Sequence, residues 1–165
     1  MRRGLVLLLA LAGCSSAPLQ SDWERAHPEE GWREEQPAPP PYPRAGELLE
    51  FSVPDARSFR FFVDASTLSV DRDGVVRYAL VARGADGAQN VSYEGLRCAT
   101  GEYRIYAIGR PDERSWSPAP GQWQPVASAP RAVLQHEYFC RQTLRDRDEA
   151  VRRLRDGRWR SGRDY

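Results

Sequence analysis

The sequence predicts an α+β fold, with a mainly antiparallel β-meander of about five strands followed by one or two C-terminal helices. Segments that alternate apolar and polar residues are separated by Asp73-Gly74 and Asp86-Gly87, dipeptides that favour tight β-hairpin turns. Beyond residue 143, acidic residues precede arginines by four positions, which is typical of a solvent-exposed helix. Residues 46–157 contain all of these segments and are expected to form one globular domain.

The expected strands follow one another closely along the chain. They cover residues 59–64, 67–72, 75–83, 90–98 and 102–109. Val76, Tyr78 and Leu80 alternate with more polar neighbours, as in a half-buried strand. Within residues 90–98 the apolar residues change face around Gly95, and a β-bulge at this glycine would account for the change.

Two short helices are expected after a long ordered loop over residues 111–130. The first covers residues 132–140, and the second covers residues 143–155, with Gly157 placed to end it. Three apolar residues form a narrow packing stripe on the second helix: Leu144, Val151 and Leu154. Residues 158–165 form an arginine-rich tail, which is either a frayed terminus or a segment that lies on an anionic membrane surface.

The first fourteen residues predict export. Two arginines precede an apolar run over residues 5–11, as in a secretory signal peptide, and the run is too short for the roughly 20 residues of a membrane span. Leu11-Ala12-Gly13-Cys14 resembles the lipobox of bacterial lipoproteins. That resemblance implies removal of residues 1–13, acylation of Cys14 and a stable lipid anchor. Ser15 in the next position implies an outer-membrane destination, with the protein facing the periplasm.

Residues 14–45 are expected to form an acidic, proline-rich and disordered tether between the lipid and the domain. The stretch over residues 36–43 reads Gln-Pro-Ala-Pro-Pro-Pro-Tyr-Pro, which favours a stiff polyproline II spacer, or alternatively a ligand for SH3-like domains. Trp23 and Trp32 are unusual in a disordered tether. Three roles are open for them: resting on the domain, sitting in the lipid interface or binding a partner.

Composition argues against several classes of function. The chain has no lysine and a net charge of only +1, so no overall field marks a nucleic-acid-binding protein. His27 and His136 are the only histidines, and no pattern for a metal site, a cofactor or a Ser-His-Asp triad is present. Carboxylate pairs such as Asp64 with Glu94 or Glu102 leave one enzymatic alternative, a hydrolase of envelope glycans.

Binding is favoured over catalysis. Four residues are the candidates for a partner surface: Tyr93, Arg97, Trp116 and Trp123. Aromatic rings with arginines suit a protein partner or the sugar rings of peptidoglycan, although the same rings can instead fill the core. We interpret the protein as a non-catalytic binding or accessory module of the cell envelope. A purely structural lipoprotein is the second alternative.

Four segments carry a family resemblance: Phe-Phe-Val-Asp at residues 61–64, Asp-Gly-Val-Val-Arg-Tyr at residues 73–78, Asn-Val-Ser-Tyr-Glu-Gly-Leu-Arg-Cys at residues 90–98 and Tyr-Phe-Cys at residues 138–140. They resemble the cryptic neisserial protein family, small exported proteins of Gram-negative bacteria. The likeness covers about residues 50–155 and implies no activity, substrate or catalytic residue.

The cysteines predict one disulfide. If Cys14 carries lipid, Cys98 and Cys140 remain as an even pair in an oxidising compartment. Their positions fit the pattern of the resembled family, and the alternative is a pair of buried thiols.

Overall fold

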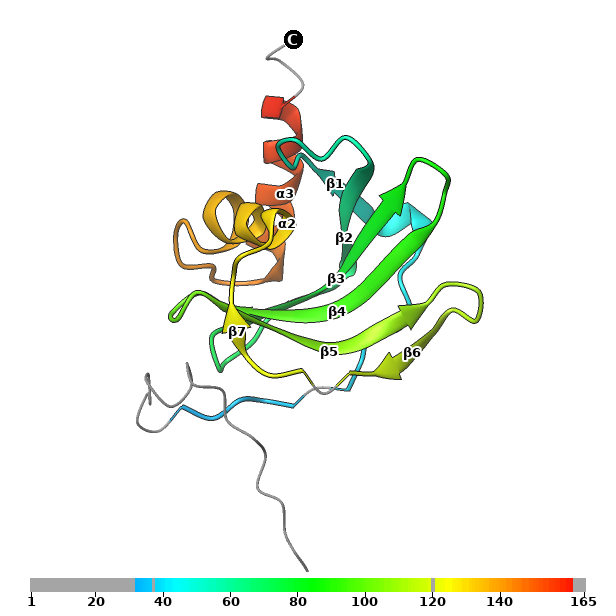
Figure 1. Ribbon diagram of the computed structural model, residues 1–165. Coiled ribbons are helices and arrows are strands. Elements are labelled where there is room, and N and C mark those ends of the chain that lie inside the picture. Colours follow the sequence, from blue (N-terminus) through cyan, green and yellow to red (C-terminus); the bar gives the residue numbers. More distant parts are fainter. Residues whose placement is uncertain (1–31, 37, 120, 162–165) are drawn as a thin grey trace, which may run out of the picture.

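A computed structural model describes residues 32–36, 38–119 and 121–161, with side chains as far as Gly157 (Figure 1). It confirms the α+β fold and the antiparallel meander, in the strand order β1-β2-β3-β4-β5-β6, with β7 pairing to β5. The strands are β1 Leu48–Phe51, β2 Phe59–Val70, β3 Val75–Gly84, β4 Gln89–Arg97, β5 Glu102–Arg110, β6 Ser115–Pro118 and β7 Gln124–Pro125. The helices are η1 Ala45–Glu47, α2 Ala129–Val133, η2 Leu134–Phe139 and α3 Arg147–Ser161. No helix in this part of the chain is long and apolar enough to cross a membrane.

The two Asp-Gly dipeptides lie at hairpin turns, as predicted. Gly74 and Gly87 have φ angles of 77° and 87°, a region that favours glycine because it lacks a Cβ. The amide of Gly74 donates to the carbonyl of Asp71, and the amide of Gly87 donates to the carbonyl of Gly84. These turns join β2 to β3 and β3 to β4, and so bring the longest strands together in the middle of the sheet.

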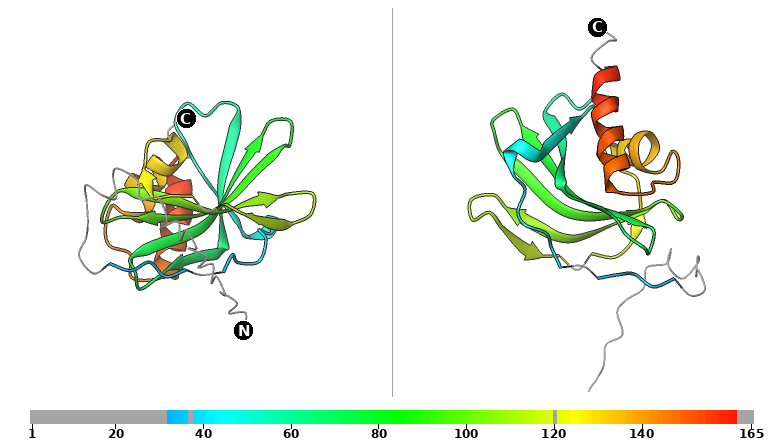
Figure 2. Two further views of the ribbon diagram at one scale, coloured as in Figure 1. Left: turned by 60° about the horizontal axis from the view of Figure 1, so that its bottom comes forward. Right: turned by 180° about the vertical axis from the view of Figure 1, so that it is seen from behind.

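The inner face of the sheet packs on the helices. Figures 1 and 2 show the curved sheet with α2 and α3 on its concave side. Tyr78 of β3 and Phe139 of η2 are fully buried there, with ring centroids 5.4 Å apart. The three residues of the apolar stripe predicted for the last helix are all buried, Val151 and Leu154 on α3 and Leu144 in the segment before it. Burial of such apolar side chains is the main stabilising contribution to the domain.

The outer face of the sheet is covered by the chain's own N-terminal segment. Residues 32–36 and 38–44, here called the N-terminal strap, run across it on the side opposite the helices (Figures 1 and 2). Tyr42 of the strap packs there against Trp116 and a small apolar cluster that includes Phe62 and Val91. The tether expected over residues 14–45 therefore differs from the structure, because its second half belongs to the folded domain.

The expected bulge at Gly95 is wrong. The register of β3 with β4 is unbroken, and the shift lies between β4 and β5, where Tyr106 is the extra residue. Gly95 instead makes room for that tyrosine, because a Cβ at Gly95 would come within 2.4 Å of the Tyr106 hydroxyl. The apolar residues of β4 change face because both faces are buried, one by the helices and one by the strap.

The two C-terminal helices are present, but their details differ from the prediction. The first begins as α2 and continues as η2, a π-helix. The second, α3, runs past Gly157 to Ser161, so Gly157 does not end it. A Cβ at Gly157 would lie 2.4 Å from the Tyr138 ring, so this glycine permits the close approach of α3 to η2.

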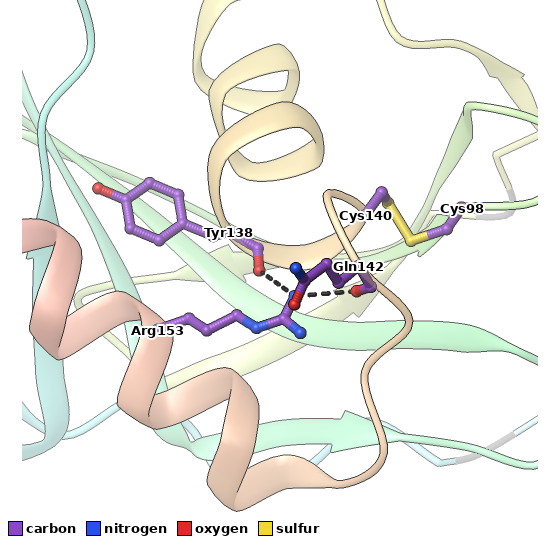
Figure 3. Close-up of a disulfide and its surroundings, with 5 residues drawn as sticks. All are labelled: Cys98, Tyr138, Cys140, Gln142 and Arg153. Carbon is purple, nitrogen blue, oxygen red and sulfur yellow. Dashed lines mark hydrogen bonds between the residues drawn. A yellow bond between two sulfur atoms is a disulfide. The ribbon is translucent and has the colours of Figure 1, made fainter.

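A Cys98–Cys140 disulfide joins the end of β4 to the end of η2, with the two Cα atoms 5.2 Å apart. The predicted pairing is therefore present. Figure 3 shows that Arg153 of α3 reaches the chain on both sides of Cys140. Its guanidinium donates to the carbonyls of Tyr138, at 3.2 Å, and Gln142, at 2.9 Å. The disulfide and Arg153 together hold η2 between the sheet and α3.

Candidate functional site

The four residues predicted as a partner surface lie on the outer face, under the N-terminal strap. Tyr93 and Trp123 are only 3% and 4% exposed, Arg97 is buried, and Trp116 is half-buried. The structure therefore brings them to one face of the sheet but covers that face with the protein's own chain. Cys14, the predicted lipid attachment site, lies outside the described residues.

The strap places the carboxylate of Glu34 in a pocket of hydrogen-bond donors. Glu34 accepts from Arg104 at 2.5 Å, from the Tyr106 hydroxyl at 2.7 Å and from the indole of Trp123 at 3.2 Å. The Arg77 guanidinium lies 3.9 Å away. Burial, together with the hydrogen bond to Glu34, raises the pKa of Tyr106, so its hydroxyl stays protonated and donates. We call the three residues that donate to Glu34, namely Arg104, Tyr106 and Trp123, the carboxylate pocket.

Arg77 of β3 lies behind the carboxylate pocket and is completely buried. Its two terminal nitrogens donate to the two oxygens of Asp73, at 2.6 and 3.1 Å, and it also donates to Asp71 at 2.7 Å. A further hydrogen bond of 2.7 Å reaches the carbonyl of Glu35 in the strap. A buried guanidinium needs such partners because desolvation of an unpaired charge is very costly.

Arg77 also affects the pKa of Asp73, the aspartate of the first hairpin turn. Burial alone raises the pKa of Asp73, but hydrogen bonds from Arg77 and from the amides of Glu35 and Val75 outweigh it and hold the pKa below its ordinary value. The turn, the buried arginine and the strap therefore form one charged network.

Trp32 begins the described part of the strap and rests on the domain. The Arg97 guanidinium carbon lies 3.8 Å from the centroid of its ring, as in a cation–π interaction. The ring meets Trp123 edge to face at 5.9 Å, and the indole nitrogen donates to the carbonyl of Asp73 at 2.7 Å. Of the three roles left open for Trp32, the structure favours contact with the domain, while Trp23 lies outside the described residues.

The proline-rich end of the strap is held through its backbone. The indole nitrogen of Trp116 donates to the carbonyl of Pro40 at 2.7 Å, and Arg114 reaches the carbonyl of Pro43 at 3.5 Å. The Tyr42 ring lies 5.2 Å from the Trp116 ring. Aromatic grooves that bind extended, proline-rich chains use the same combination of ring contacts and hydrogen bonds to carbonyls.

An open groove of about 1200 Å³ lies between the β1–β2 connection and the helices η2 and α3. Phe59 and Phe61 line one wall, and His136, Tyr138 and Arg141 line the other. Phe59 is 43% exposed, one of only two large apolar side chains in the described residues with such exposure. The groove therefore exposes both apolar and charged side chains to solvent.

Both walls of the groove contain unusual backbone. Asp55, in the β1–β2 connection, has a φ angle of 61°, which is uncommon outside glycine. The opposite wall is the π-helix η2, and π-helical turns occur frequently at functional sites. Neither feature was visible in the sequence pattern, because local periodicity does not distinguish a π-helical turn from an α-helical one.

The three carboxylates considered for a glycan hydrolase are buried in the domain. Asp64 is fully buried and accepts hydrogen bonds from the amides of Arg44 and Ser66. Glu94 is fully buried and pairs with Arg131 at 2.6 Å, and Glu102 is 3% exposed. In the described part of the chain, no three residues of the metal-binding types His, Cys, Asp and Glu group together.

The strap, the strands and most of α3 match a single family model. The model of the CNP1-like family covers residues 27–155. The chain belongs to the CNP1-like family. This confirms the resemblance drawn from the sequence, and the match includes the whole strap of this CNP1-like protein. No curated protein and no solved structure matches the chain.

Sequence reasoning missed the residues that organise the outer face of this CNP1-like protein. Glu34 and Asp73 look like ordinary surface charges in the sequence because they stand among polar or turn residues, and Arg77 takes a polar position in an alternating strand. One signal was available, namely Trp32 in an otherwise polar segment. An aromatic residue in such a segment indicates contact with another surface.

Proposed function

We propose that this CNP1-like protein is a lipoprotein of the cell envelope, anchored through Cys14 to the outer membrane and facing the periplasm. Its domain binds a protein partner in the groove between the β1–β2 connection and η2, and it catalyses no reaction. The anchor is supported by the lipobox-like Leu11-Ala12-Gly13-Cys14. The groove, with Phe59 exposed at its edge, carries the binding function.

The shape of the groove favours a chain segment over a small molecule. Pockets for small ligands are usually enclosed and measure about 300–1000 Å³. This groove is open, somewhat larger and bordered by exposed polar residues, including His136 and Arg141. Exposed phenylalanine beside charged side chains is typical of surfaces that anchor an apolar residue of a protein partner within a polar rim.

Photo-crosslinking in intact cells tests the groove. A benzophenone amino acid in place of Phe59 is expected to give one dominant protein adduct. The same probe at Ile108 is the matched control, because Ile108 is 44% exposed on β5 and does not line the groove. Arg141→Glu in the groove wall is expected to reduce the Phe59 adduct at least fivefold, since it reverses an exposed charge next to the bound segment.

The possible outcomes distinguish three functions: binding of a protein partner, binding of peptidoglycan and a purely structural role. A protein adduct at Phe59 that is absent at Ile108 and sensitive to Arg141→Glu supports the proposal. Adducts to muropeptides alone indicate peptidoglycan binding instead. Equal adducts at both positions, or none at Phe59, contradict partner binding in the groove and favour the purely structural lipoprotein.

Replacing Cys14 with alanine tests the anchor. The variant is expected to leave the membrane fraction almost completely and appear in the soluble periplasm, because the acyl chains that hold the protein can no longer be attached. Fractionation followed by immunoblotting measures the change, with Cys14-containing protein as reference. Fractionation that is unchanged from wild type would rule out lipidation at this residue.

A further inference from the structure

The strap lies on the outer face without forming part of the sheet. No residue of the strap pairs with a strand, and η1 separates the strap from β1. Its hydrogen bonds to the sheet pass through backbone groups, the indole of Trp32 and the carboxylate of Glu34. The strap can therefore leave the face without breaking a strand ladder.

We propose that the outer face is a second binding site, which takes an acidic, proline-rich segment of a partner protein, and that the N-terminal strap occupies this site in cis. The site is the carboxylate pocket together with Trp116. It is distinct from the groove, and the inference does not rest on the function proposed for the groove.

The cis contacts define the segment that fits. It presents a carboxylate to the pocket, as Glu34 does, and its next carbonyl accepts from Arg77. Six residues after the carboxylate, an extended chain offers a carbonyl to the Trp116 indole, as Pro40 does. An aromatic residue two positions later packs on the same indole ring, as Tyr42 does.

Charge complementarity is the reason to expect an acidic partner. The pocket directs Arg104, Tyr106 and Trp123 at one carboxylate, and a group with charge-assisted hydrogen bonds binds more strongly than a neutral one. With Glu34 gone, these three donors would lack their anion, whereas Arg77 would keep Asp71 and Asp73. An incoming carboxylate restores those hydrogen bonds.

A peptide with the sequence of residues 30–44, carrying a fluorophore, serves as the probe in trans. The full chain is used as the acceptor, in three forms: wild type, Glu34→Gln and Trp32→Ala. Both substitutions weaken the cis strap, and Trp32→Ala does so while keeping Glu34 and every donor residue of the carboxylate pocket. Glu35→Gln is the matched control, because the exposed Glu35 contacts the sheet through its backbone groups.

We expect the peptide to bind the Glu34→Gln and Trp32→Ala chains at least tenfold more tightly than the wild type and the Glu35→Gln chain, because a tethered strap competes at an effective concentration near the millimolar range. A peptide with glutamine in place of the glutamate at position 34 should bind both weakened acceptors at least tenfold less tightly. Fluorescence anisotropy measures the affinities, and thermal melts show that each acceptor is folded.

Two results overturn the proposal. If folded Glu34→Gln and Trp32→Ala chains both fail to bind the peptide, the strap is a fixed part of the domain. If the glutamate and glutamine peptides bind equally, the pocket does not recognise a carboxylate. Crosslinking at Phe59 is unaffected by either result, so failure of this site and failure of the groove are distinguishable.

Discussion

Replacing Arg77 with methionine is expected to lower the free energy of unfolding by about 3–5 kcal/mol at pH 7, because it leaves buried carboxylates without their cation. The side chain of Asp73 is only 1% exposed, and it loses both of its hydrogen bonds from the guanidinium. The backbone of Glu35 in the strap loses a donor as well. Urea unfolding at constant pH measures the loss as a shift of the midpoint.

The pH dependence of the same variant identifies the cause. In the wild type, the lowered pKa of Asp73 stabilises the fold above the carboxyl's unfolded value of 3.8, and this contribution is lost as the pH falls through the lower folded value. In the variant, burial without the arginine disfavours the charged carboxylate. The difference between wild type and variant should therefore shrink below pH 4.

An exposed arginine provides the control for Arg77. Arg110 is 56% exposed and lies 3.4 Å from the exposed Glu113. Arg110→Met is expected to change stability by less than about 0.5 kcal/mol, as for most surface substitutions. Equal effects of the two substitutions, or a difference that does not vary with pH, would contradict the role given to the buried network.

Loss of the Cys98–Cys140 disulfide is expected to cost about 4 kcal/mol. The bridge spans a sequence separation of 42 residues, and a loop of this length gives that value in the chain-entropy model. Cys98→Ala with Cys140→Ala, made in a Cys14→Ala background, removes every thiol and leaves the rest of the domain unchanged. Thermal and urea unfolding measure the change.

Chemical reduction is the control for this prediction. The Cys14→Ala chain treated with dithiothreitol should unfold at the same midpoint as the triple variant, since both lack the same crosslink. Treatment of the triple variant itself should have no effect. A midpoint that neither reduction nor substitution alters would mean that the bridge does not restrict the unfolded chain.

Local patterns were sufficient for the order of the central strands, although the two strands expected over residues 59–64 and 67–72 are one strand, β2. The turns at Gly74 and Gly87 and the alternation in β3 are properties of a few neighbouring residues, so sequence alone predicted the meander. The short strands β1, β6 and β7 were missed, because two to four residues are too few to show a period. The end of α3 was misplaced because Gly157 serves a contact with Tyr138 rather than a helix terminus.

The outer face was harder to predict, because its contacts join distant parts of the chain. Glu34 lies 70 residues from Arg104 and 89 from Trp123, so no local window contains the pocket. The sequence analysis grouped Tyr93, Arg97, Trp116 and Trp123 as an exposed surface, yet they are covered by a segment whose composition is typical of disorder. The proline-rich strap is ordered because side chains of the sheet, including Trp116 and Arg114, donate hydrogen bonds to its carbonyl groups.

The position of the strap also determines how the protein responds to force. A load applied from the N-terminal side, where the proposed anchor lies, reaches the strap before it reaches β1. Rupture of the contacts of Trp32, Glu34 and Pro40 would release residues 32–44, a contour of roughly 45 Å at about 3.4 Å per residue, while the sheet stays intact. Tension applied from the N-terminal side would therefore act on the contacts that cover the outer face before it acts on β1.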